Sequence, residues 1–251
     1  LIGFADEFNR LKPDLILILG DRYEIMCAAM AATVARTPIA HLHGGEATEG
    51  CIDEAIRHSI TKMSHLHFVA AEDYRKRVIQ LGENPERVFC VGGLGIDNIL
   101  KLDLLSKQEL ENSLDFKLSA KSMLITFHPV TLEDNTSGDQ MRELLASLSK
   151  FTDFKIIFTK PNADTDGRKI LKLIESFCLD NHNCRAYTSL GQLRYLSCLK
   201  YVDVVVGNSS SGLLEVPSFK IPTVNIGDRQ KGRLKAGCVI DCSPIKNQII
   251  S

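Results

Sequence analysis

Short hydrophobic runs alternate with amphipathic segments along the whole chain. The hydrophobic runs predict strands over Asp14–Leu19, Ile39–His43, Leu66–Ala70, Arg87–Val91, Ser122–Phe127, Phe154–Thr159, Cys184–Tyr187, Val202–Val206 and Thr223–Ile226. The segments between them repeat apolar residues at helical spacing and predict helices over Glu24–Ala35, Asp53–Met63, Asp73–Leu81, Gln140–Lys150, Asp166–Leu179, Leu190–Leu199 and Ser211–Phe219. Strands and helices that alternate in this way are typical of parallel sheets, so the pattern predicts an α/β fold.

Two of the predicted strands are apolar at almost every position. Leu15-Ile16-Leu17-Ile18-Leu19 contains no polar residue, and Val202-Asp203-Val204-Val205-Val206 contains one. A strand with this pattern is usually covered on both faces, because an open face would expose its apolar side chains to water. We therefore expect doubly wound sheets with helices on both sides.

The alternation is interrupted once, around residues 98–121. Two short helical pieces follow one another there without a strand between them, and they carry charged residues such as Lys101 and Glu109. We therefore predict two Rossmann-like lobes, at residues 1–100 and 121–251, joined by a linker at 101–120. The first lobe shows only four strands, fewer than a doubly wound sheet usually has, and the chain opens with Leu1 inside an amphipathic helix. Both observations lead us to expect that an N-terminal part of this lobe is missing.

The composition argues against several classes of protein. The 30 Lys and Arg residues balance 31 Asp and Glu residues, for a net charge of -1, so no broad basic field is available to hold a nucleic acid. No apolar run reaches the roughly 20 residues needed to cross a bilayer. The eight cysteines show neither a C-x-x-C pair nor the spacing of zinc ligands, and the sequence shows no secretion signal. We therefore expect reduced thiols and a cytoplasmic location.

Polar residues gather just after the predicted strands. Ligands bind at the carboxyl ends of the strands in a parallel sheet, so these segments are the first candidates for a site. The richest of them are Gly20–Glu24, His41–Glu46, Asp53–His58, Phe127–Thr131, Thr159–Asp164 and Gly207–Gly212. Polar surface residues also collect at strand ends that bind nothing, so the prediction depends on the joint pattern.

The segment Gly207-Asn208-Ser209-Ser210-Ser211-Gly212 has the composition of an anion site. It joins a buried strand to a helix, and the backbone N–H groups at such a junction, with Ser hydroxyls beside them, suit a phosphate. The alternative is simple helix capping, for which one Ser is enough. The chain contains neither a Walker loop nor a G-x-G-x-x-G sequence after a strand. This absence argues against P-loop hydrolysis and against nicotinamide or flavin chemistry.

Carboxylates and basic residues are concentrated in the first lobe, at Asp21, Glu46, Asp53, Glu54, Arg57 and His58. Carboxylates that face a sugar or a diphosphate commonly perform acid–base chemistry. A structural role is the alternative, because Asp53 with Arg57, and Glu54 with His58, are i,i+4 pairs on one predicted helix.

Two histidines lie close together in the same region. His41 and His43 are two positions apart with one residue between them, and we place both on a strand. We expect at most one of them to reach the site. The sequence therefore predicts no metal site here.

Taken together, these segments resemble the UDP-N-acetylglucosamine 2-epimerase family, and more narrowly its hydrolysing branch, which serves sialic-acid-type sugar synthesis. The resemblance rests on Gly20-Asp21-Arg22-Tyr23-Glu24, His41-Leu42-His43-Gly44-Gly45-Glu46, Ile52-Asp53-Glu54-Ala55-Ile56-Arg57-His58-Ser59-Ile60-Thr61-Lys62, Phe127-His128-Pro129-Val130-Thr131 and Gly207-Asn208-Ser209-Ser210. It extends along nearly the whole chain in the same order. It implies a GT-B-type fold, in which two Rossmann-like lobes hold a sugar nucleotide in the cleft between them.

The resemblance also implies a reaction, in which UDP-N-acetylglucosamine and water give UDP and N-acetylmannosamine. A base removes the proton at C2 while UDP leaves from C1, and water then adds to the resulting glycal, without a cofactor. The positions that match catalytic ones are Asp21, Glu46, Asp53, Glu54 and His128. The positions that match substrate contacts are Arg22, Arg57, His58, Asn162, Ser209, Ser210, Glu215 and Arg229. Among these, the resemblance assigns the two Ser residues to the phosphates and Glu215 to the ribose hydroxyls.

The sequence departs from the family pattern at one position and separates the two branches at others. His43 occupies a position where some relatives carry a carboxylate. The Gly-Asp-Thr and His-Val-Glu-Ala-Gly-type sequences of the non-hydrolysing branch are absent, which favours hydrolysis. A non-hydrolysing epimerase, a GT-B glycosyltransferase and an inactive nucleotide-sugar-binding fragment are the alternatives. We expect a UDP-sugar as the small-molecule partner and a homo-oligomer, either a dimer or a tetramer.

Overall fold

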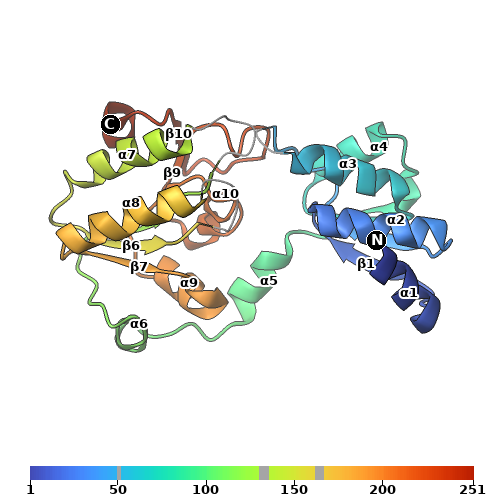
Figure 1. The fold of residues 1–251 in the computed structure, drawn as a ribbon, viewed down its shortest axis with the longest axis horizontal. Coiled ribbons are helices and arrows are strands. Elements are labelled where there is room, and N and C mark those ends of the chain that lie inside the picture. Colours follow the sequence, from blue (N-terminus) through green and yellow to red (C-terminus); the bar gives the residue numbers. More distant parts are fainter. Residues whose placement is uncertain (50–51, 130–135, 162–166) are drawn as a thin grey trace. The chain divides into compact units, whose positions relative to one another are not determined.

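The structure, a computed structural model, describes residues 1–49, 52–129, 136–161 and 167–251 (Figure 1). The chain divides into two compact units, Leu1–Leu94 and Gly95–Ser251. The elements up to the division are α1 (Ile2–Leu11), β1 (Ile16–Leu19), α2 (Tyr23–Val34), β2 (Ile39–Leu42), α3 (Asp53–Met63), β3 (Leu66–Val69), α4 (Glu72–Gln80), the 3-10 helix η1 (Pro85–Arg87) and β4 (Val88–Cys90). Helix α5 (Leu94–Lys101) begins at the division.

The second unit continues with a longer series of strands and helices. They are α6 (Lys107–Leu114), β5 (Ser122–Thr126), α7 (Ser137–Leu148), β6 (Lys155–Thr159), α8 (Gly167–Asp180), β7 (Cys184–Tyr187), α9 (Gly191–Leu199), β8 (Val204–Gly207), α10 (Ser211–Leu214), the 3-10 helix η2 (Val216–Phe219), β9 (Thr223–Ile226), β10 (Val239–Cys242) and α11 (Lys246–Ile250). Every strand predicted from the sequence is present, with bounds that differ by at most two residues.

Apart from the short helices η1 and α11, which are not predicted, two elements differ from the prediction. Strand β10 is not predicted, because it is a short edge strand that pairs only with β9 and interrupts its apolar run with Asp241. The single helix expected over Ser211–Phe219 is instead α10 followed by η2. Pro217 explains the change, since it cannot donate the backbone hydrogen bond that would continue an α-helix.

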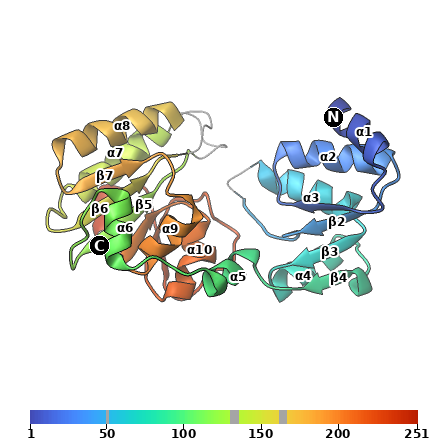
Figure 2. The same cartoon turned by 90° about the horizontal axis from the view of Figure 1, so that it is seen from below.

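The sheet of the first unit is covered on one face. Its four strands are parallel and follow the order β1-β2-β3-β4. Ile18 and Ile39 pack against α2 and α3, and Val69 and Val88 pack against α4. The three helices lie on the same face of the sheet (Figure 2). Strands added in one direction by crossovers of one hand place all their helices on one side.

The opposite face of this sheet is apolar and exposed. Leu17 and Leu19 are 65% and 53% exposed, and Phe89, which stacks on Phe68, is 43% exposed. The expectation that the Leu15–Leu19 run is covered on both faces is therefore wrong for the described residues. The strand is apolar on both faces, but no described helix lies on the side of Leu17 and Leu19.

The second unit is doubly wound, as predicted. Its six parallel strands follow the order β10-β9-β8-β5-β6-β7, so the direction of winding changes between β8 and β5. Helices α7 and α8 lie on one face of the sheet (Figure 1). They pack there around Ile125 and Phe158. Helices α6 and α9 pack on the other face around Leu124 and Val205. Strand β8, from the second apolar run, is accordingly buried on both sides.

The segment expected to be a linker, residues 101–120, contributes to this second core. Leu110, Leu114, Phe116 and Leu118 are buried against the face that α9 covers. Helix α6 begins with a capping box formed by Ser106 and Glu109, which satisfies two backbone donors at its start. No helix in the described part of the chain is long and apolar enough to cross a membrane.

Candidate active site

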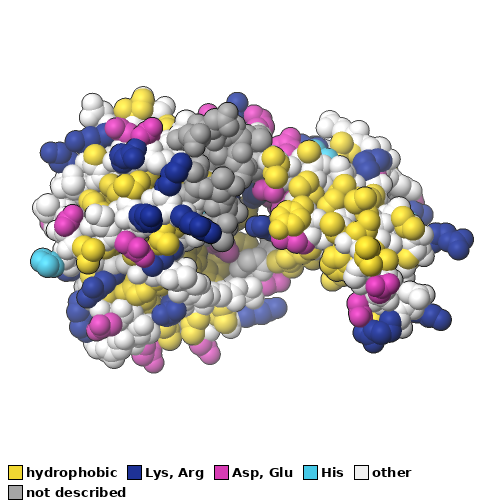
Figure 3. All heavy atoms as spheres, in the orientation of Figure 1, with side chains coloured by type: hydrophobic (Ala, Val, Ile, Leu, Met, Phe, Trp, Pro, Cys, Tyr) yellow, Lys and Arg dark blue, Asp and Glu magenta, His cyan; other side chains and the backbone are white. Residues whose placement is uncertain are grey.

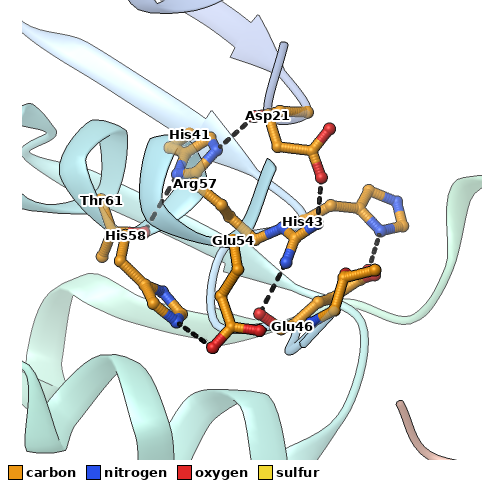
Figure 4. Close-up of polar contacts among 10 residues, drawn as sticks. Asp21, His41, His43, Glu46, Glu54, Arg57, His58 and Thr61 are labelled. Atoms are coloured by element: carbon orange, nitrogen blue, oxygen red, sulfur yellow. Dashed lines mark hydrogen bonds and ion pairs between the residues drawn. The ribbon is translucent and has the colours of Figure 1, made fainter. Parts of the chain in front are cut away.

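A buried arginine organises the carboxyl end of the first sheet. Arg57 of α3 is 1% exposed, and its guanidinium donates to the carboxylate of Asp21, which follows β1 (Figure 4). A second nitrogen of Arg57, Nη1, donates to the backbone oxygen of Glu46 at 2.8 Å. Arg57 thereby ties together the loops that follow β1 and β2. A buried guanidinium requires such partners, because an uncompensated buried charge is costly.

His41 supports the same loops from below the sheet end. Its Nε2 lies 3.0 Å from the backbone oxygen of Gly20, and its Nδ1 lies 3.3 Å from the hydroxyl of Thr61 on α3. Burial lowers the pKa of His41 to about 4, so the ring is neutral near pH 7. Since the Gly20 oxygen can only accept, Nε2 carries the proton and Nδ1 accepts from Thr61.

His43 lies beyond the end of β2 and takes a different direction. Its backbone has a positive φ of 62°, a conformation that residues other than Gly rarely adopt. Its Nδ1 lies 2.8 Å from Oε1 of Glu46, which is 3% exposed. The side chain of His43 is 21% exposed. A partly exposed imidazole with a buried carboxylate behind it is an arrangement suited to proton transfer.

Glu54 and His58 extend the cluster along α3. Oε2 of Glu54 accepts a 2.6 Å hydrogen bond from the backbone N–H of Thr48, which fixes the loop before the helix. Oε1 of Glu54 lies 3.9 Å from Nε2 of His58, and burial lowers the pKa of His58. Asp53 lies in the first turn of α3, where a negative charge is favoured by the helix dipole.

The structure thus brings together five of the predicted residues of the first unit, and His43 with them. The five are Asp21, Glu46, Glu54, Arg57 and His58 (Figure 4). Arg22 differs, because it lies on the surface at the start of α2, where its Nε contacts Glu24 at 3.4 Å. The pairing of His43 with Glu46 was not predicted, because it depends on the positive φ of His43, where the backbone turns just beyond the end of β2.

In the second unit, the winding change between β5 and β8 gathers the predicted residues. Gly207 at the end of β8 has φ 142°, and a Cβ there would overlap the carbonyl oxygen of Thr126 on β5. This close approach requires Gly and sets the end of β8 directly beside the end of β5. His128, two residues beyond β5, is 9% exposed and lies next to Asn208, which is fully buried.

The loop after β8 offers donors that suit an anion. Within the described residues, the chain itself uses no backbone N–H of Ser209 or Ser210 in a hydrogen bond. Both residues are partly exposed. Ser211 differs from them, because its hydroxyl forms a hydrogen bond with the buried hydroxyl of Tyr195. Burial of Tyr195 raises the pKa of its phenol, which leaves it protonated.

Glu215 and Arg229 lie close to this loop. Arg229 follows β9, and its Nη1 donates to the backbone oxygen of Asn208 at 3.2 Å. Glu215 follows α10 and packs against Gly95 of α5, where a Cβ would lie 3.3 Å from Oε1 of Glu215. Asn162, the remaining predicted contact, lies outside the described residues.

Among the residues that the structure describes, no three His, Cys, Asp or Glu side chains are grouped so that they could hold a metal ion. The polar groups that converge are instead hydrogen-bonding and acid–base groups. They form two sets, one at the strand ends of each unit.

The chain is similar in sequence to a known family of enzymes and to curated members of it. The family description "UDP-N-acetylglucosamine 2-epimerase" matches residues 1–251. A "GDP/UDP-N,N'-diacetylbacillosamine 2-epimerase (hydrolyzing)" of Campylobacter jejuni is 46% identical over 95% of this chain and 62% of its own length. The "Polysialic acid biosynthesis protein P7" of Escherichia coli is 46% identical over 100% of this chain and 64% of its own length. This chain therefore spans less than two thirds of the length of these curated relatives.

The fold agrees with these matches. The crystal structure of a UDP-GlcNAc 2-epimerase from Neisseria meningitidis, bound to UDP-GlcNAc, superposes with a TM-score of 0.85 at 19% identity, over 99% of this chain and 69% of the other. At that identity the likeness concerns the fold alone, and it confirms the α/β fold with two parallel sheets that the sequence predicts. Since the family pattern matches the chain over residues 1–251, this chain belongs to the UDP-N-acetylglucosamine 2-epimerase family.

Proposed function

We propose that this chain carries the machinery of a hydrolysing 2-epimerase, which converts UDP-N-acetylglucosamine or a diacetamido relative into UDP and a free 2-epimeric sugar. The observation that carries the proposal is the cluster of Asp21, Glu46 and His43 around the buried Arg57. The reaction needs groups that take and return protons at C2, and it needs donors for the departing diphosphate. The first unit supplies groups of the first kind and the second unit supplies groups of the second kind.

In this proposal, Asp21, Glu46, Asp53, Glu54 and His128 serve the reacting end of the sugar. Arg57 and His58 belong to the same set, although the burial of Arg57 suits it to holding Asp21 and the Glu46 loop in place. Arg22, which is exposed at the start of α2, is assigned to the diphosphate. Removal of the C2 proton, departure of UDP and addition of water to the glycal are then three steps at one sugar.

The nucleotide belongs to the second unit. Ser209 and Ser210 present backbone N–H groups and hydroxyls of the kind that bind phosphate oxygens. Glu215 is assigned to the ribose hydroxyls, Arg229 to the diphosphate and Asn162 to a further contact with the nucleotide. Arg229 is supported by its bond to the backbone of the same loop.

The nature of the sugar is a second part of the proposal. The relatives that are 46% and 37% identical to this chain, from Campylobacter jejuni and Legionella pneumophila, carry names that specify hydrolysis of a diacetylbacillosamine nucleotide. The Escherichia coli relative, also 46% identical, is named for polysialic acid synthesis. We therefore give UDP-N-acetylglucosamine and UDP-N,N'-diacetylbacillosamine equal standing as test substrates.

The experiment is product analysis in D2O with each substrate. The expected products are UDP and a free sugar of inverted configuration at C2 that carries one deuterium at that carbon. Deuterium at C2 without release of UDP would indicate a non-hydrolysing epimerase. Sugar transfer that requires an added acceptor would indicate a glycosyltransferase. Tight binding of UDP with no turnover of either substrate would indicate a nucleotide-sugar-binding module.

The proposal includes a cytoplasmic site of action and assembly into a homo-oligomer, a dimer or a tetramer. The described cysteines, all of them free, support a reducing compartment. Light scattering at several protein concentrations tests the assembly, and a single monomeric mass would contradict it.

A further inference from the structure

One buried side chain of the second unit connects the segments that follow β5 and β8. Asn208 is fully buried immediately after β8. Its Oδ1 accepts a 2.7 Å hydrogen bond from the backbone N–H of His128, and its Nδ2 donates to the backbone oxygen of His128 at 2.8 Å. Both polar ends of the amide are therefore used on a single residue.

This pairing continues the ladder between β5 and β8. Thr126 pairs with Gly207, and the backbone N–H of Asn208 donates to the Thr126 oxygen at 3.0 Å. The pairing of the two strands ends at this point, and the side-chain amide of Asn208 then takes the place of a peptide group. Both the N–H and the C=O of His128 are therefore hydrogen-bonded, as in a residue inside the sheet, although His128 lies outside β5.

The backbone oxygen of Asn208 is also engaged. It accepts from Nη1 of Arg229 at 3.2 Å and from Nε2 of Gln230 at 2.8 Å. Ser209 and Ser210 follow directly in the chain. Asn208 therefore connects the backbone of His128 with the start of the Ser loop and with the segment after β9.

We propose that Asn208 is a positioning residue, whose side-chain amide fixes the backbone of His128 and so sets the direction of the imidazole relative to the Ser209–Ser210 loop. The inference rests on the proposed function for its effect on turnover. Its effect on the His128 ring does not depend on any activity. An amide is required because the two groups that it holds are a donor and an acceptor.

The test compares Asn208→Asp with Asn225→Asp. The first change keeps the size of the side chain but sets an oxygen against the backbone oxygen of His128. The second is a matched control, because Asn225 on β9 is also buried, at 2% exposure, and donates through Nδ2 to Asp241 rather than to His128. Both variants place a carboxylate where an amide donated to an oxygen, so both are expected to lower thermal stability.

The two readouts are the NMR signals of the His128 ring, assigned with His128→Gln, and the steady-state constants. In Asn208→Asp we expect the His128 ring signals to shift or broaden and kcat to fall on the order of 10²-fold, as for a misplaced reacting group. Affinity for UDP should fall by a smaller factor than kcat. In Asn225→Asp, the His128 signals and kcat should match those of the parent chain.

The outcomes separate this inference from the proposed function. Unchanged His128 signals in folded Asn208→Asp overturn the positioning role, even where the parent chain shows turnover. If the parent chain turns over neither substrate, the proposed activity is contradicted. Displaced His128 signals in Asn208→Asp would still support the positioning role in that case. Should Asn208→Asp not fold, Asn208→Ser, which is neutral and shorter, gives the same comparison, and the same two results decide it.

Discussion

At the scale of single residues, the ion pair of Asp21 and Arg57 bears on both the stability of the fold and the proposed chemistry. Arg57 is 1% exposed, and the Asp21 carboxylate is its only partner of opposite charge among the contacts that the structure shows for it. Asp21→Asn removes that charge and leaves a buried guanidinium without compensation. We expect the free energy of unfolding to fall by about 3 kcal/mol and turnover to fall by about 10²-fold or more. Chemical denaturation and steady-state kinetics measure the two effects.

The two parts can be separated with a second substitution. Arg57→Met in the Asp21→Asn background removes the uncompensated charge and fills a similar volume. We expect this double variant to regain part of the lost stability but none of the turnover. Recovery of turnover together with stability would show that Asp21 serves only to balance Arg57.

The Ser209–Ser210 loop leads to a prediction about the affinity for UDP. Replacing Ser209 and Ser210 together with Ala removes two hydroxyls that are assigned to the diphosphate. Binding of UDP should weaken by on the order of 1–3 kcal/mol, measured by titration calorimetry. The matched control replaces Ser113 and Ser149, whose hydroxyls bond to carbonyl oxygens of their own helices. Equal affinities in the two double variants would place the diphosphate elsewhere.

The residues of the site were predictable from sequence to the extent that strand ends are predictable. Asp21, Glu46 and His128 all follow recognisable strands, so their grouping at two sheet edges could be expected. The role of His43 could not, because its positive φ depends on how the chain leaves β2. The role of Asn208 could not either, since its hydrogen bonds reach a residue 80 positions away in the chain.

At the scale of elements, His41 joins β1, β2 and α3 and makes their stability depend on pH. The folded unit holds this ring neutral, with a pKa of about 4, whereas an unfolded chain protonates it near 6.5. Between these two values the unfolded chain binds more protons than the folded one, so stability falls as pH falls through this window. The loss of folding stability caused by His41 reaches about 3 kcal/mol at the acid end of this window.

Denaturation of the parent chain and of His41→Gln at several pH values between 4 and 7 measures this effect. The variant should lose less stability than the parent as the pH is lowered, because it has no imidazole to protonate. Burial also lowers the pKa of His58 and His67, so a smaller slope persists in the variant. His182→Gln, at an exposed position, is the control and should retain the slope of the parent. Identical slopes in all three proteins would contradict the assignment to His41.

The elements themselves were largely predictable, and the exceptions have local causes. The periodicity of apolar residues located the strands because a buried parallel strand leaves few polar positions. It missed β10, whose position at the sheet edge relaxes that requirement. It could not show that β1 is covered on one face only, because an all-apolar strand indicates two buried faces, and the open face found for the described residues departs from that pattern.

At the scale of the whole molecule, the two units differ in how fully they bury their apolar residues. The second unit has a core on each side of its sheet. The first unit exposes Leu17, Leu19 and Phe89 on one side of its sheet. On its helical side, hydrophobic side chains also gather over α1 and α2 (Figure 3), where Ile2, Met30 and Val34 are exposed. Large contiguous apolar patches are uncommon on soluble monomers and commonly mark interaction surfaces.

The exposed sheet face predicts how the 251-residue chain behaves in solution. Apolar surface that meets water favours self-association, and it binds dyes whose fluorescence rises in apolar surroundings. We expect the chain to bind such a dye while folded. The double change Leu17→Lys with Leu19→Lys should reduce both the fluorescence and the apparent mass in light scattering. Since both side chains point away from the core, the unfolding midpoint should change little.

A single change in the second unit provides the comparison for this experiment. Leu179 on α8 is 81% exposed, yet the sheet next to it is covered on both faces. Leu179→Lys therefore removes an exposed leucine without altering an open sheet face, and it should leave dye binding and apparent mass close to those of the parent. If it reduced both as much as the double change does, dye binding would reflect scattered surface leucines. A reduction confined to the Leu17 and Leu19 variant would show that dye binding and self-association occur on the open face of the first sheet.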